Sequence, residues 1–404
     1  MKKFNKNLAL CIVAALVVIG GMASKSFVLG LKDTAFAFFN DIRSVGVFDA
    51  FKTFTANAEK CASANLTYHN NLVDINSVFN NAIGTRIITK DDMIVVKADN
   101  GYLANTRYVL PDDILSYRVD KVKELEEASS KNGADFLYVI APSKGHDLKY
   151  APNIEDYTKF NCDRLFDFLK QKDIPTLNLI DKMHEDGLGE EDMFFVTDHH
   201  WKSGGALWGT DKILAELQDR YAYPYDKENT DISNYNIKTY EDWFLGSQGK
   251  KAGRFFTSRG VDDFDVITPK FKTHLTEAQP LKDHFREGSF QDTVMYMENV
   301  ETKDLYTKNP YAAYSGGDFR EQIITNKLNP DGKKILIIRD SYACALVPFL
   351  SLNTSQLYVT DVRSDAFYVG EKINVPEYIE KIKPDCVMVF YSGAPLGDDL
   401  YNFD

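Results

Sequence analysis

Two parts of the chain alternate between apolar runs and amphipathic stretches. Phe136–Ala141 is a continuous apolar run that stops before a proline, and Lys334–Arg339 contains a second such run. Runs of this kind are typical of strands that are buried on both faces of a parallel sheet. Val119–Asn132 instead carries apolar residues at helical spacing with charged residues between them, which predicts a helix. The same patterns predict further strands over Thr176–Ile180, Met193–Thr197, Gln356–Thr360 and Cys386–Tyr391, and further helices over Tyr157–Lys172, Lys202–Tyr221 and Pro376–Lys383.

This alternation predicts an α/β fold with a mostly parallel sheet that is covered by helices on both faces. Residues 119–221 and 331–404 are expected to form that core. Residues 222–330 interrupt the rhythm with aromatic residues, glycines and alternating stretches such as Phe264–Ile267 and Thr293–Met297. We therefore expect residues 222–330 to be a β-rich insertion.

The part of the chain before the core is less regular. Residues 26–118 are expected to pack on the core as an N-terminal segment. A short strand is predicted at Asp92–Val96, and Asn100–Leu103 has the pattern of a turn that leads into another strand.

Residues 1–25 have the pattern of a targeting segment. Three lysines within the first six residues precede an apolar stretch from Leu8 to Ala23, which is shorter than a transmembrane helix requires. Met22-Ala23-Ser24 matches an Ala-x-Ala cleavage site poorly, which favours an uncleaved signal anchor over a cleaved signal peptide. In both cases the rest of the chain is expected to be extracytoplasmic.

Composition excludes some classes of function. The chain has 47 Lys and Arg against 59 Asp and Glu, a net charge of −12, and no long basic run. A nucleic-acid-binding protein is therefore not expected. The five cysteines are widely spaced, which argues against a disulfide scaffold and a zinc ribbon, and Cys344 and Cys386 are expected to be buried thiols. The high aromatic content, 13%, suits both a packed core and a sugar-facing cleft.

Polar residues concentrate where two predicted strands end. Asp198-His199-His200-Trp201 follows the strand predicted at Met193–Thr197, and Asp340-Ser341 follows Lys334–Arg339. In open parallel sheets, reactive groups gather beyond the carboxyl ends of the strands. The two motifs are therefore expected to meet at one edge of the sheet.

Ser341 stands between an apolar strand and a helical pattern that begins at Tyr342. At such a corner its hydroxyl projects above the sheet, and free backbone N–H groups can hold an oxyanion. The alternative is that Asp340 or Ser341 does no more than cap the helix.

Asp198 and His200 are two residues apart, so their side chains point the same way in an extended segment. A serine hydroxyl becomes a nucleophile when a histidine that is oriented by a carboxylate lies within hydrogen-bond reach. Other interpretations remain open: Asp198 caps the next helix, His199 packs in the core, Trp201 forms a wall, or the cluster binds a metal. Adjacent histidines are expected to point apart, and no third ligand follows at helical spacing, which disfavours the metal.

The string Thr197–Trp201 resembles the signature of the DHHW family of exported bacterial proteins. That family is similar to the SGNH-hydrolase-like alginate O-acetyltransferases, which carry Thr-Asp-x-His-Trp and a later Asp-Ser block. The resemblance implies an SGNH-like three-layer sandwich and a triad in which Ser341 takes an acetyl group, His200 acts as base and acid, and Asp198 fixes its tautomer. It also implies a polysaccharide acceptor and a membrane-bound O-acyltransferase that supplies acetyl groups. No cofactor or metal is expected.

Further residues are candidates for contacts with the substrate or the oxyanion. The backbone N–H groups of Gly316 and Gly317 can complete an oxyanion hole or form a simple turn. Lys144, after the first predicted strand, can contact substrate or be a solvated loop lysine. Arg339 replaces the glycine that usually precedes Asp-Ser in the related proteins, and it is expected to pair with Asp340 rather than to bind a negatively charged substrate. Trp201 is the last of these candidates.

The predicted function is extracytoplasmic O-acetyl transfer to a cell-surface or secreted polysaccharide through an acetyl-serine intermediate. A carbohydrate acetylesterase would use the same triad with water as the acceptor. A non-catalytic glycan-binding or assembly protein is the third alternative.

Overall fold

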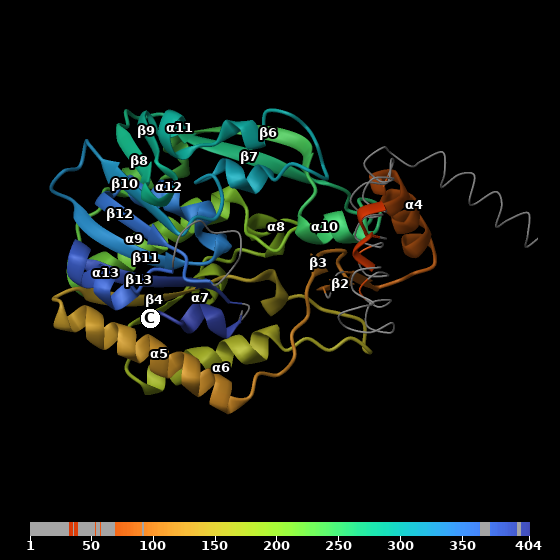
Figure 1. Ribbon diagram of the computed structural model, residues 1–404, viewed down its shortest axis with the longest axis horizontal. Helices are drawn as coiled ribbons and strands as arrows, with labels where there is room; N and C mark the ends of the chain where they lie inside the picture. Colours follow the sequence, from red (N-terminus) through yellow and green to blue (C-terminus); the bar gives the residue numbers. More distant parts are fainter. Residues whose placement is uncertain are drawn as a thin grey trace, which may run out of the picture. The chain divides into compact units, whose positions relative to one another are not determined.

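The computed structural model describes residues 32–34, 36–38, 53, 57, 69–90, 93–363, 372–393 and 397–404. The predicted targeting segment, residues 1–25, lies outside them. The chain divides into two compact units, Met1–Ile83 and Gly84–Asp404. Helix α4 (His69–Ala82) belongs to the first unit, and the elements described below belong to the second (Figure 1). Within the described ranges, no helix combines the length and the apolar character needed to cross a membrane.

The second unit is built on one large sheet. Its strands are β4 (Asp135–Ala141), β5 (Thr176–Asn178), β8 (Leu275–Gln279), β9 (His284–Gly288), β10 (Glu321–Asn326), β11 (Lys333–Arg339), β12 (Thr354–Thr360) and β13 (Cys386–Ser392). Among the described residues, the strand order is β5-β4-β13-β11-β12-β10-β8-β9. The neighbours from β5 to β12 are parallel, and β10, β8 and β9 continue the sheet antiparallel. The predicted α/β fold with a mostly parallel sheet is confirmed.

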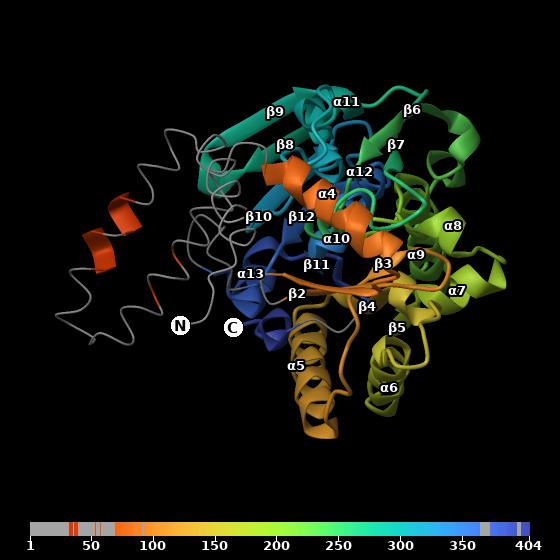
Figure 2. The same ribbon diagram turned by 90° about the vertical axis from the view of Figure 1, so that its right-hand side faces the viewer.

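Helices cover both faces of the sheet. One face packs against α5 (Asp112–Lys131), α6 (Thr158–Gln171) and α13 (Val375–Ile382). The other packs against α7 (Leu179–Glu185), α9 (Ser203–Tyr221) and α12 (Leu346–Ser351). Figures 1 and 2 both show α5 and α6 side by side below the sheet.

The residues of each central strand alternate between the two cores. Phe136 and Tyr138 of β4 join the core under α5 and α6, whereas Leu137 and Val139 join the core under α9 and α12. Because both faces are buried, the strand must be apolar throughout, which explains its continuous apolar run. This is the predicted three-layer arrangement.

Residues 222–330 contribute several strands that lie outside the parallel part of the sheet. Besides β8, β9 and β10, they form the antiparallel pair β6 (Tyr235–Phe244) and β7 (Asp262–Pro269), which contains the strand predicted at Phe264–Ile267. Two short helices, α10 (Ser247–Ala252) and α11 (Phe290–Val294), come from the same region.

A small antiparallel sheet precedes the core. It consists of β1 (Ile87–Lys90), β2 (Met93–Lys97) and β3 (Leu103–Ala104). The predicted turn before β3 is confirmed: Gly101 has a φ of 89°, a left-handed conformation that glycine adopts without strain.

The strand predicted at Met193–Thr197 is wrong. Helix α8 (Glu190–Met193) ends there, and Phe194 meets Trp201 only in an isolated bridge. The backbone N–H groups of Val196 and Thr197 donate to the Asp262 carboxylate at 2.6 and 2.8 Å. Since these donors are satisfied by a side chain, the segment has no ladder to join and forms a loop.

Three other elements differ from the prediction. The stretch Thr293–Met297 is not a strand, because α11 occupies its start behind the Ser289 capping box. The strand predicted to reach Ile180 stops earlier, because the Asn178 side chain accepts the Ile180 N–H at 3.0 Å and starts α7. Helix α5 begins at Asp112, seven residues before its predicted start, since two acidic residues favour the first turn.

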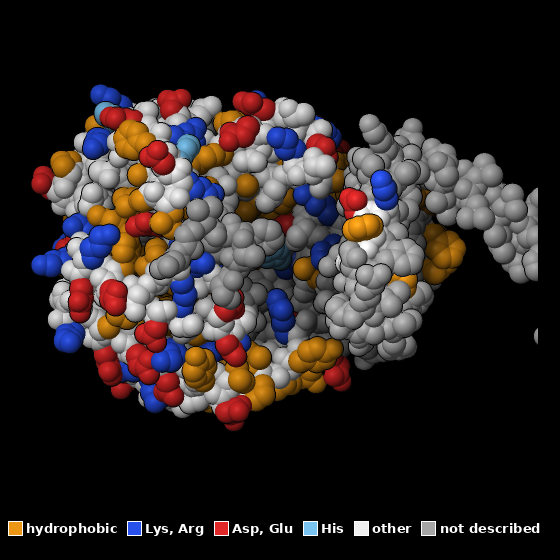
Figure 3. Space-filling model, viewed as in Figure 1, with side chains coloured by type: hydrophobic (Ala, Val, Ile, Leu, Met, Phe, Trp, Pro, Cys, Tyr) orange, Lys and Arg blue, Asp and Glu red, His pale blue; other side chains and the backbone are white. Residues whose placement is uncertain are grey.

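Two predictions from composition can also be compared with the structure. Cys344 and Cys386 are buried free thiols, as predicted, and so is Cys162. On the face shown in Figure 3, acidic and basic side chains are interspersed, and no continuous basic surface is visible.

Candidate active site

The carboxyl ends of β4, β11 and β13 meet at one pocket of about 590 Å³. Both polar motifs reach it, because His199 and Ser341 are part of its wall. The wall also includes Asn105, Arg107, Ser143, Lys144, Gly145, Gln248, Asp340, Arg363 and Ser392. The two motifs are therefore neighbours at the sheet edge where parallel sheets collect their reactive groups.

Ser341, His200 and Asp198 form a continuous chain of hydrogen bonds. Nε2 of His200 lies 3.0 Å from Oγ of Ser341, and Nδ1 of His200 lies 2.5 Å from Oδ1 of Asp198. Asp198 and His200 are buried, 3% and 7% exposed. An imidazole that donates its Nδ1 hydrogen to the carboxylate leaves Nε2 free to accept the hydroxyl proton. The arrangement is able to remove a proton from Ser341 as its oxygen attacks an acyl carbon.

Backbone donors hold the Asp198 carboxylate in place. Oδ1 accepts the N–H of His200 at 3.0 Å, and Oδ2 accepts the N–H of Ser247, at the start of α10, at 2.7 Å. Burial opposes the negative charge, but the electrostatic interactions with His199 and His200 and the hydrogen bonds from His200 and Ser247 hold the pKa of Asp198 well below its usual value. The carboxylate therefore stays ionised and can orient the imidazole.

Asp262 shapes the loop that carries the motif. Besides the two N–H groups named above, its carboxylate accepts the hydroxyl of Thr197 at 2.5 Å. Burial raises the pKa of Asp262, and the hydrogen bonds from Val196 and Thr197 oppose that shift. Sequence patterns carried no signal for Asp262, because it lies 65 residues from Thr197 in the chain.

Lys144 is not a solvated loop residue, although it belongs to the wall of the pocket. It is 2% exposed, and its ammonium group donates to the carbonyl oxygens of Phe195 at 3.0 Å, Val196 at 3.2 Å and Asp198. Burial lowers the pKa of Lys144 to about 7, against the opposing charges of Asp198 and Asp262. The three hydrogen bonds hold the backbone of the loop that carries Asp198 and His200 (the motif loop, residues 194–201). The sequence position of Lys144 does not reveal this role.

Asp340, and not Ser341, caps the turn that follows β11, so the Ser341 hydroxyl is left to interact with His200. Asp340 caps the 3-10 turn η7 (Ser341–Cys344) by accepting the N–H of Tyr342 at 2.9 Å. Its other carboxylate oxygen accepts the N–H of Ser392 at 2.9 Å, which ties β11 to the end of β13. The Ser341 N–H opens the turn, a position where backbone donors have no partner within the turn.

Trp201 and Tyr311 both hydrogen-bond to the backbone next to Ser341, and Tyr311 also packs on the imidazole of His200. The indole of Trp201 is fully buried and donates to the carbonyl oxygen of Tyr342 at 3.0 Å. Trp201 is therefore a wall, as one interpretation of the sequence had it, and not a substrate contact. The ring of Tyr311 stacks on His200 with centroids 4.1 Å apart, and its hydroxyl donates to the same carbonyl oxygen at 2.8 Å. No sequence motif pointed to Tyr311.

Arg339 is buried and does not line the pocket. The expected pairing of Arg339 with the Asp340 carboxylate is wrong. The guanidinium is paired with the Asp318 carboxylate and donates to the carbonyl oxygen of Gly317 at 2.9 Å. It meets Asp340 at the backbone carbonyl oxygen, at 3.4 Å. Gly316 packs against the ring of Tyr296, where a Cβ atom would come within 2.8 Å. Gly316 and Gly317 thus belong to the turn that holds Arg339, and neither is part of the wall of the Ser341 pocket.

The Asp318–Arg339 pair is expected to stabilise the fold beneath Ser341. Asp318→Asn should lower the free energy of unfolding by about 2 kcal/mol near neutral pH, because it removes the nearer of the two carboxylates that face the buried guanidinium, the other being Asp361 at 3.9 Å. Although burial opposes it, the charges of Arg339 and Arg363 hold the pKa of Asp318 below its usual value of 3.8. The contribution is therefore present above that pH and lost as the pH falls through the lower folded value.

Urea unfolding of the parent and of Asp318→Asn at several pH values measures this. The difference between the two should shrink below about pH 4. Asp331→Asn, at an exposed aspartate in the turn before β11, is the matched control and should change nothing. A difference that is independent of pH would show that the ion pair is not its source.

The two histidines of the motif do not point apart, which corrects that expectation. Their ring centroids are 3.8 Å apart, and ligand atoms of Asp198, His199 and His200 lie within 4.8 Å of one another. Both ring nitrogens of His200 are nevertheless engaged, by Asp198 and Ser341, and Nδ1 of His199 contacts Oγ of Ser247 at 3.1 Å. A metal ion at this position would have to displace the contact between His200 and one of its partners.

Two residues of the pocket wall, missed from the sequence, have unmet hydrogen-bonding capacity. Nε of Arg107 and Oε1 of Gln248 are buried and have no hydrogen-bond partner among the described residues. Gln248 is 1% exposed, and its amide nitrogen donates to Asn105 at 2.7 Å. Both atoms are enclosed by the protein, so the wall of the pocket contains one donor and one acceptor that are unsatisfied.

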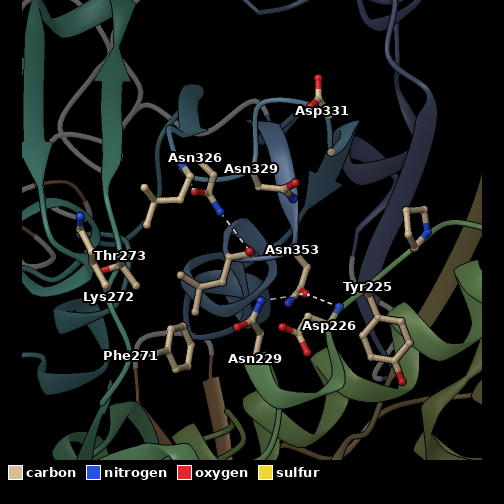
Figure 4. A pocket seen from close by; sticks show the side chains of 14 residues that line it. Tyr225, Asp226, Asn229, Phe271, Lys272, Thr273, Asn326, Asn329, Asp331 and Asn353 are labelled. Atoms are coloured by element: carbon tan, nitrogen blue, oxygen red, sulfur yellow. Dashed lines mark hydrogen bonds between the residues drawn. The ribbon is translucent and has the colours of Figure 1, made fainter.

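A larger hollow of about 750 Å³ lies at the opposite edge of the sheet, near the start of β11 and β12 (Figure 4). Four asparagines are part of its wall, and two of them, Asn229 and Asn353, are hydrogen-bonded to each other there. No serine, cysteine or histidine belongs to its wall as the described residues define it. The nucleophile and the base both lie at the other edge, which places the candidate active site there.

The fold and the site define an α/β protein with a mostly parallel sheet and a Ser-His-Asp arrangement at the carboxyl ends of its strands. Residues 179–360 match the model of the DHHW family, described as DHHW protein, so the resemblance of the Thr197–Trp201 string to that family is confirmed. A search of curated proteins finds no match to the chain.

Solved structures with the same fold include PatB1 from Bacillus cereus, which is 21% identical with a TM-score of 0.61 over 79% of this chain and 99% of PatB1. A second PatB1 structure, with a sulfonyl adduct, is 19% identical with a TM-score of 0.60 and the same coverage. A DHHW family protein from Eubacterium siraeum is 19% identical, with a TM-score of 0.55 over 78% of this chain and 97% of that one. At these identities the likeness shows the fold.

Proposed function

We propose that the chain is an extracytoplasmic O-acetyltransferase that modifies a cell-surface or secreted polysaccharide through an acetyl-Ser341 intermediate. Ser341 is the nucleophile, His200 is the general base and then the general acid, and Asp198 orients the imidazole. The observation that carries the proposal is the hydrogen-bonded chain from Asp198 through His200 to Ser341, with links of 2.5 and 3.0 Å.

The first half-reaction acetylates the serine. Oγ of Ser341 forms a bond to the acetyl carbon of the donor while its proton passes to Nε2 of His200. The backbone N–H of Ser341 stabilises the oxyanion of the tetrahedral intermediate. When this intermediate collapses, the bond to the donor's leaving group breaks, and the leaving group takes the proton from the imidazolium.

The second half-reaction transfers the acetyl group. An acceptor hydroxyl gives its proton to His200 and attacks the acetyl carbon of the intermediate. Collapse of the second tetrahedral intermediate breaks the bond to Oγ, and Ser341 recovers its proton. Water in place of the acceptor hydroxyl would make the same site an acetylesterase.

The choice of an acetyl group and a polysaccharide acceptor rests on the resemblance of the two motifs to the SGNH-like O-acetyltransferases. The polar side chains of the pocket wall, among them Asn105, Ser143 and Ser392, suit a hydroxyl-rich acceptor. PatB1 has been solved with a sulfonyl adduct, and we expect the present chain to react with sulfonyl reagents at Ser341, because such reagents capture activated nucleophiles.

The partners and the location follow from the same proposal. Residues 1–25 would hold the protein at the outer face of a membrane, and a membrane-bound O-acyltransferase would supply the acetyl groups there. The lysines and the apolar stretch of that segment support this placement. No cofactor or nucleic acid takes part in the reaction.

Turnover of a chromogenic acetyl ester tests the proposed function. The full-length chain should release the chromophore, and addition of a soluble oligosaccharide should yield acetylated product that mass spectrometry detects. Ser341→Ala should abolish both signals, whereas Ser233→Ala, at an exposed serine of the insertion, should leave them unchanged. Release without acetylated product over a range of oligosaccharides would assign an esterase. Release that survives in Ser341→Ala would refute the site.

A further inference from the structure

A second group of histidine and aspartate side chains lies outside the Ser341 pocket. His146 ends the 3-10 turn η1 (Lys144–His146), which follows β4, and Asp147 is the next residue. His184 lies in the last turn of α7. The three side chains each offer one ligand atom, and these atoms lie within 4.8 Å of one another. Two segments that are separate in the chain therefore bring two imidazoles and a carboxylate together.

The distances are close to those of a metal site. Nδ1 of His146 lies 3.0 Å from Oδ1 of Asp147, and Nε2 of His184 lies 2.9 Å from Oδ2 of the same carboxylate. Ligand atoms about 2.0–2.1 Å from a tetrahedral zinc ion are about 3.3 Å apart. The separation of each histidine nitrogen from the Asp147 carboxylate is therefore close to the separation of two ligand atoms around a zinc ion, and the three ligand atoms all lie within 4.8 Å of one another.

The arrangement around His146 calls for a positive charge. Its Nδ1 faces Asp147, and its Nε2 faces Oδ1 of Asp163, in α6, at 3.4 Å. A neutral imidazole has one N–H and one lone pair, so it can donate to one of these carboxylates but not to both. A cation bound between Nδ1 and Asp147 resolves the conflict, because Nε2 then keeps its hydrogen for Asp163. A carboxylate that accepts from the far nitrogen of a ligating histidine is the usual second shell of a metal site.

The exposure of the three groups also suits an ion. The His146 side chain is 6% exposed, whereas those of Asp147 and His184 are 32% and 46% exposed. An ion would be anchored on the buried side and open to water on the other, where a water molecule completes its coordination.

We infer that His146, Asp147 and His184 form a binding site for a divalent transition-metal ion, with zinc as the probe. Two imidazole nitrogens and one carboxylate oxygen favour zinc and its neighbours over magnesium or calcium, which take oxygen ligands. The bound ion would cross-link η1 to the end of α7. Because η1 also carries Lys144, the cross-link would stabilise the turn that clamps the backbone of the motif loop.

Isothermal titration with zinc chloride tests the inference on the full-length chain after treatment with a chelator. The parent should show saturable binding, and His184→Ala should abolish it. Asp163→Asn should weaken it by about tenfold or more, because it removes the partner of the ligating histidine. In the parent, cobalt(II) at the same site should give visible absorption bands typical of tetrahedral coordination, and these bands should be missing in His184→Ala.

Controls separate this site from other histidines. His274→Ala removes an exposed histidine that is paired with a carboxylate in the same manner, at 3.0 Å from Glu287, and it should leave binding unchanged. His200→Ala should also leave it unchanged. If His184→Ala does not fold, the isosteric Asp147→Asn replaces it. The absence of binding in the parent, binding that persists in the site variants, or binding that only His200→Ala removes would each overturn the inference.

Discussion

Replacing either Ser341 or His200 with alanine should lower kcat for acetyl-ester turnover by about 10⁴-fold or more. Ser341→Ala removes the atom that forms the covalent bond. His200→Ala leaves the hydroxyl without a base at 3.0 Å, and a serine hydroxyl alone is a poor nucleophile at neutral pH. Both variants should fold, because the substitutions leave in place the hydrogen bonds that Lys144, Asp262 and Ser247 make to the loop around Asp198.

Kinetics of the two single variants and of the double variant check this prediction. Residues that act as one unit are strongly non-additive, so the double variant should be little worse than either single one. Effects that multiply in the double variant would mean that Ser341 and His200 act independently. A single variant with nearly full kcat would remove that residue from the mechanism.

Gly246→Ala should also impair the protein severely, although Gly246 carries no chemistry. A Cβ atom at this position would lie 2.1 Å from Cβ and 2.5 Å from Cα of Asp198, far inside van der Waals contact. The backbone of Asp198 cannot yield without losing the hydrogen bonds of Asp198 to Ser247 and His200. Overpacking of this kind costs about 1–3 kcal/mol, and a displacement of the carboxylate by about 1 Å should lower kcat by about 100-fold.

Gly204→Ala is the matched control for that variant. Gly204 lies in the first turn of α9 and is exposed, and a Cβ atom added there would meet no other atom within 4 Å. Alanine there should leave kcat unchanged and the free energy of unfolding equal or slightly higher. Urea unfolding and ester turnover of both variants give the comparison. Normal activity and stability in Gly246→Ala would mean that the contact with Asp198 is not tight in solution.

The central strands are predictable from sequence, because burial on both faces requires unbroken apolar runs. The predicted bounds of β4, β11 and β13 lie within one residue of those in the structure. The motif loop is different. Its apolar residues resemble a strand, but its backbone donors are satisfied by Asp262, from a distant part of the chain. A pattern that is local in sequence cannot reveal a partner of this kind.

The candidate active site is also only partly predictable from local sequence patterns. Ser341, His200 and Asp198 could be singled out because each belongs to a compact motif at a predicted strand end. Their supporting residues could not: Lys144 has the sequence context of a surface loop, yet its ammonium group is buried against three carbonyl oxygens. Tyr311 belongs to no motif and acts through its stacking on His200. At position 339, the sequence showed that arginine replaces the usual glycine, but it did not show that this arginine pairs with the Asp318 carboxylate.

Mapping the residue that a sulfonyl fluoride modifies is the most direct measurement of the central claim. The full-length chain is incubated with the reagent, digested, and examined by tandem mass spectrometry. We predict a single sulfonyl adduct on the peptide of Ser341, which forms in the parent but much more slowly in His200→Ala. An adduct on another residue, or equal rates of labelling of Ser341 in the parent and in His200→Ala, would contradict the account.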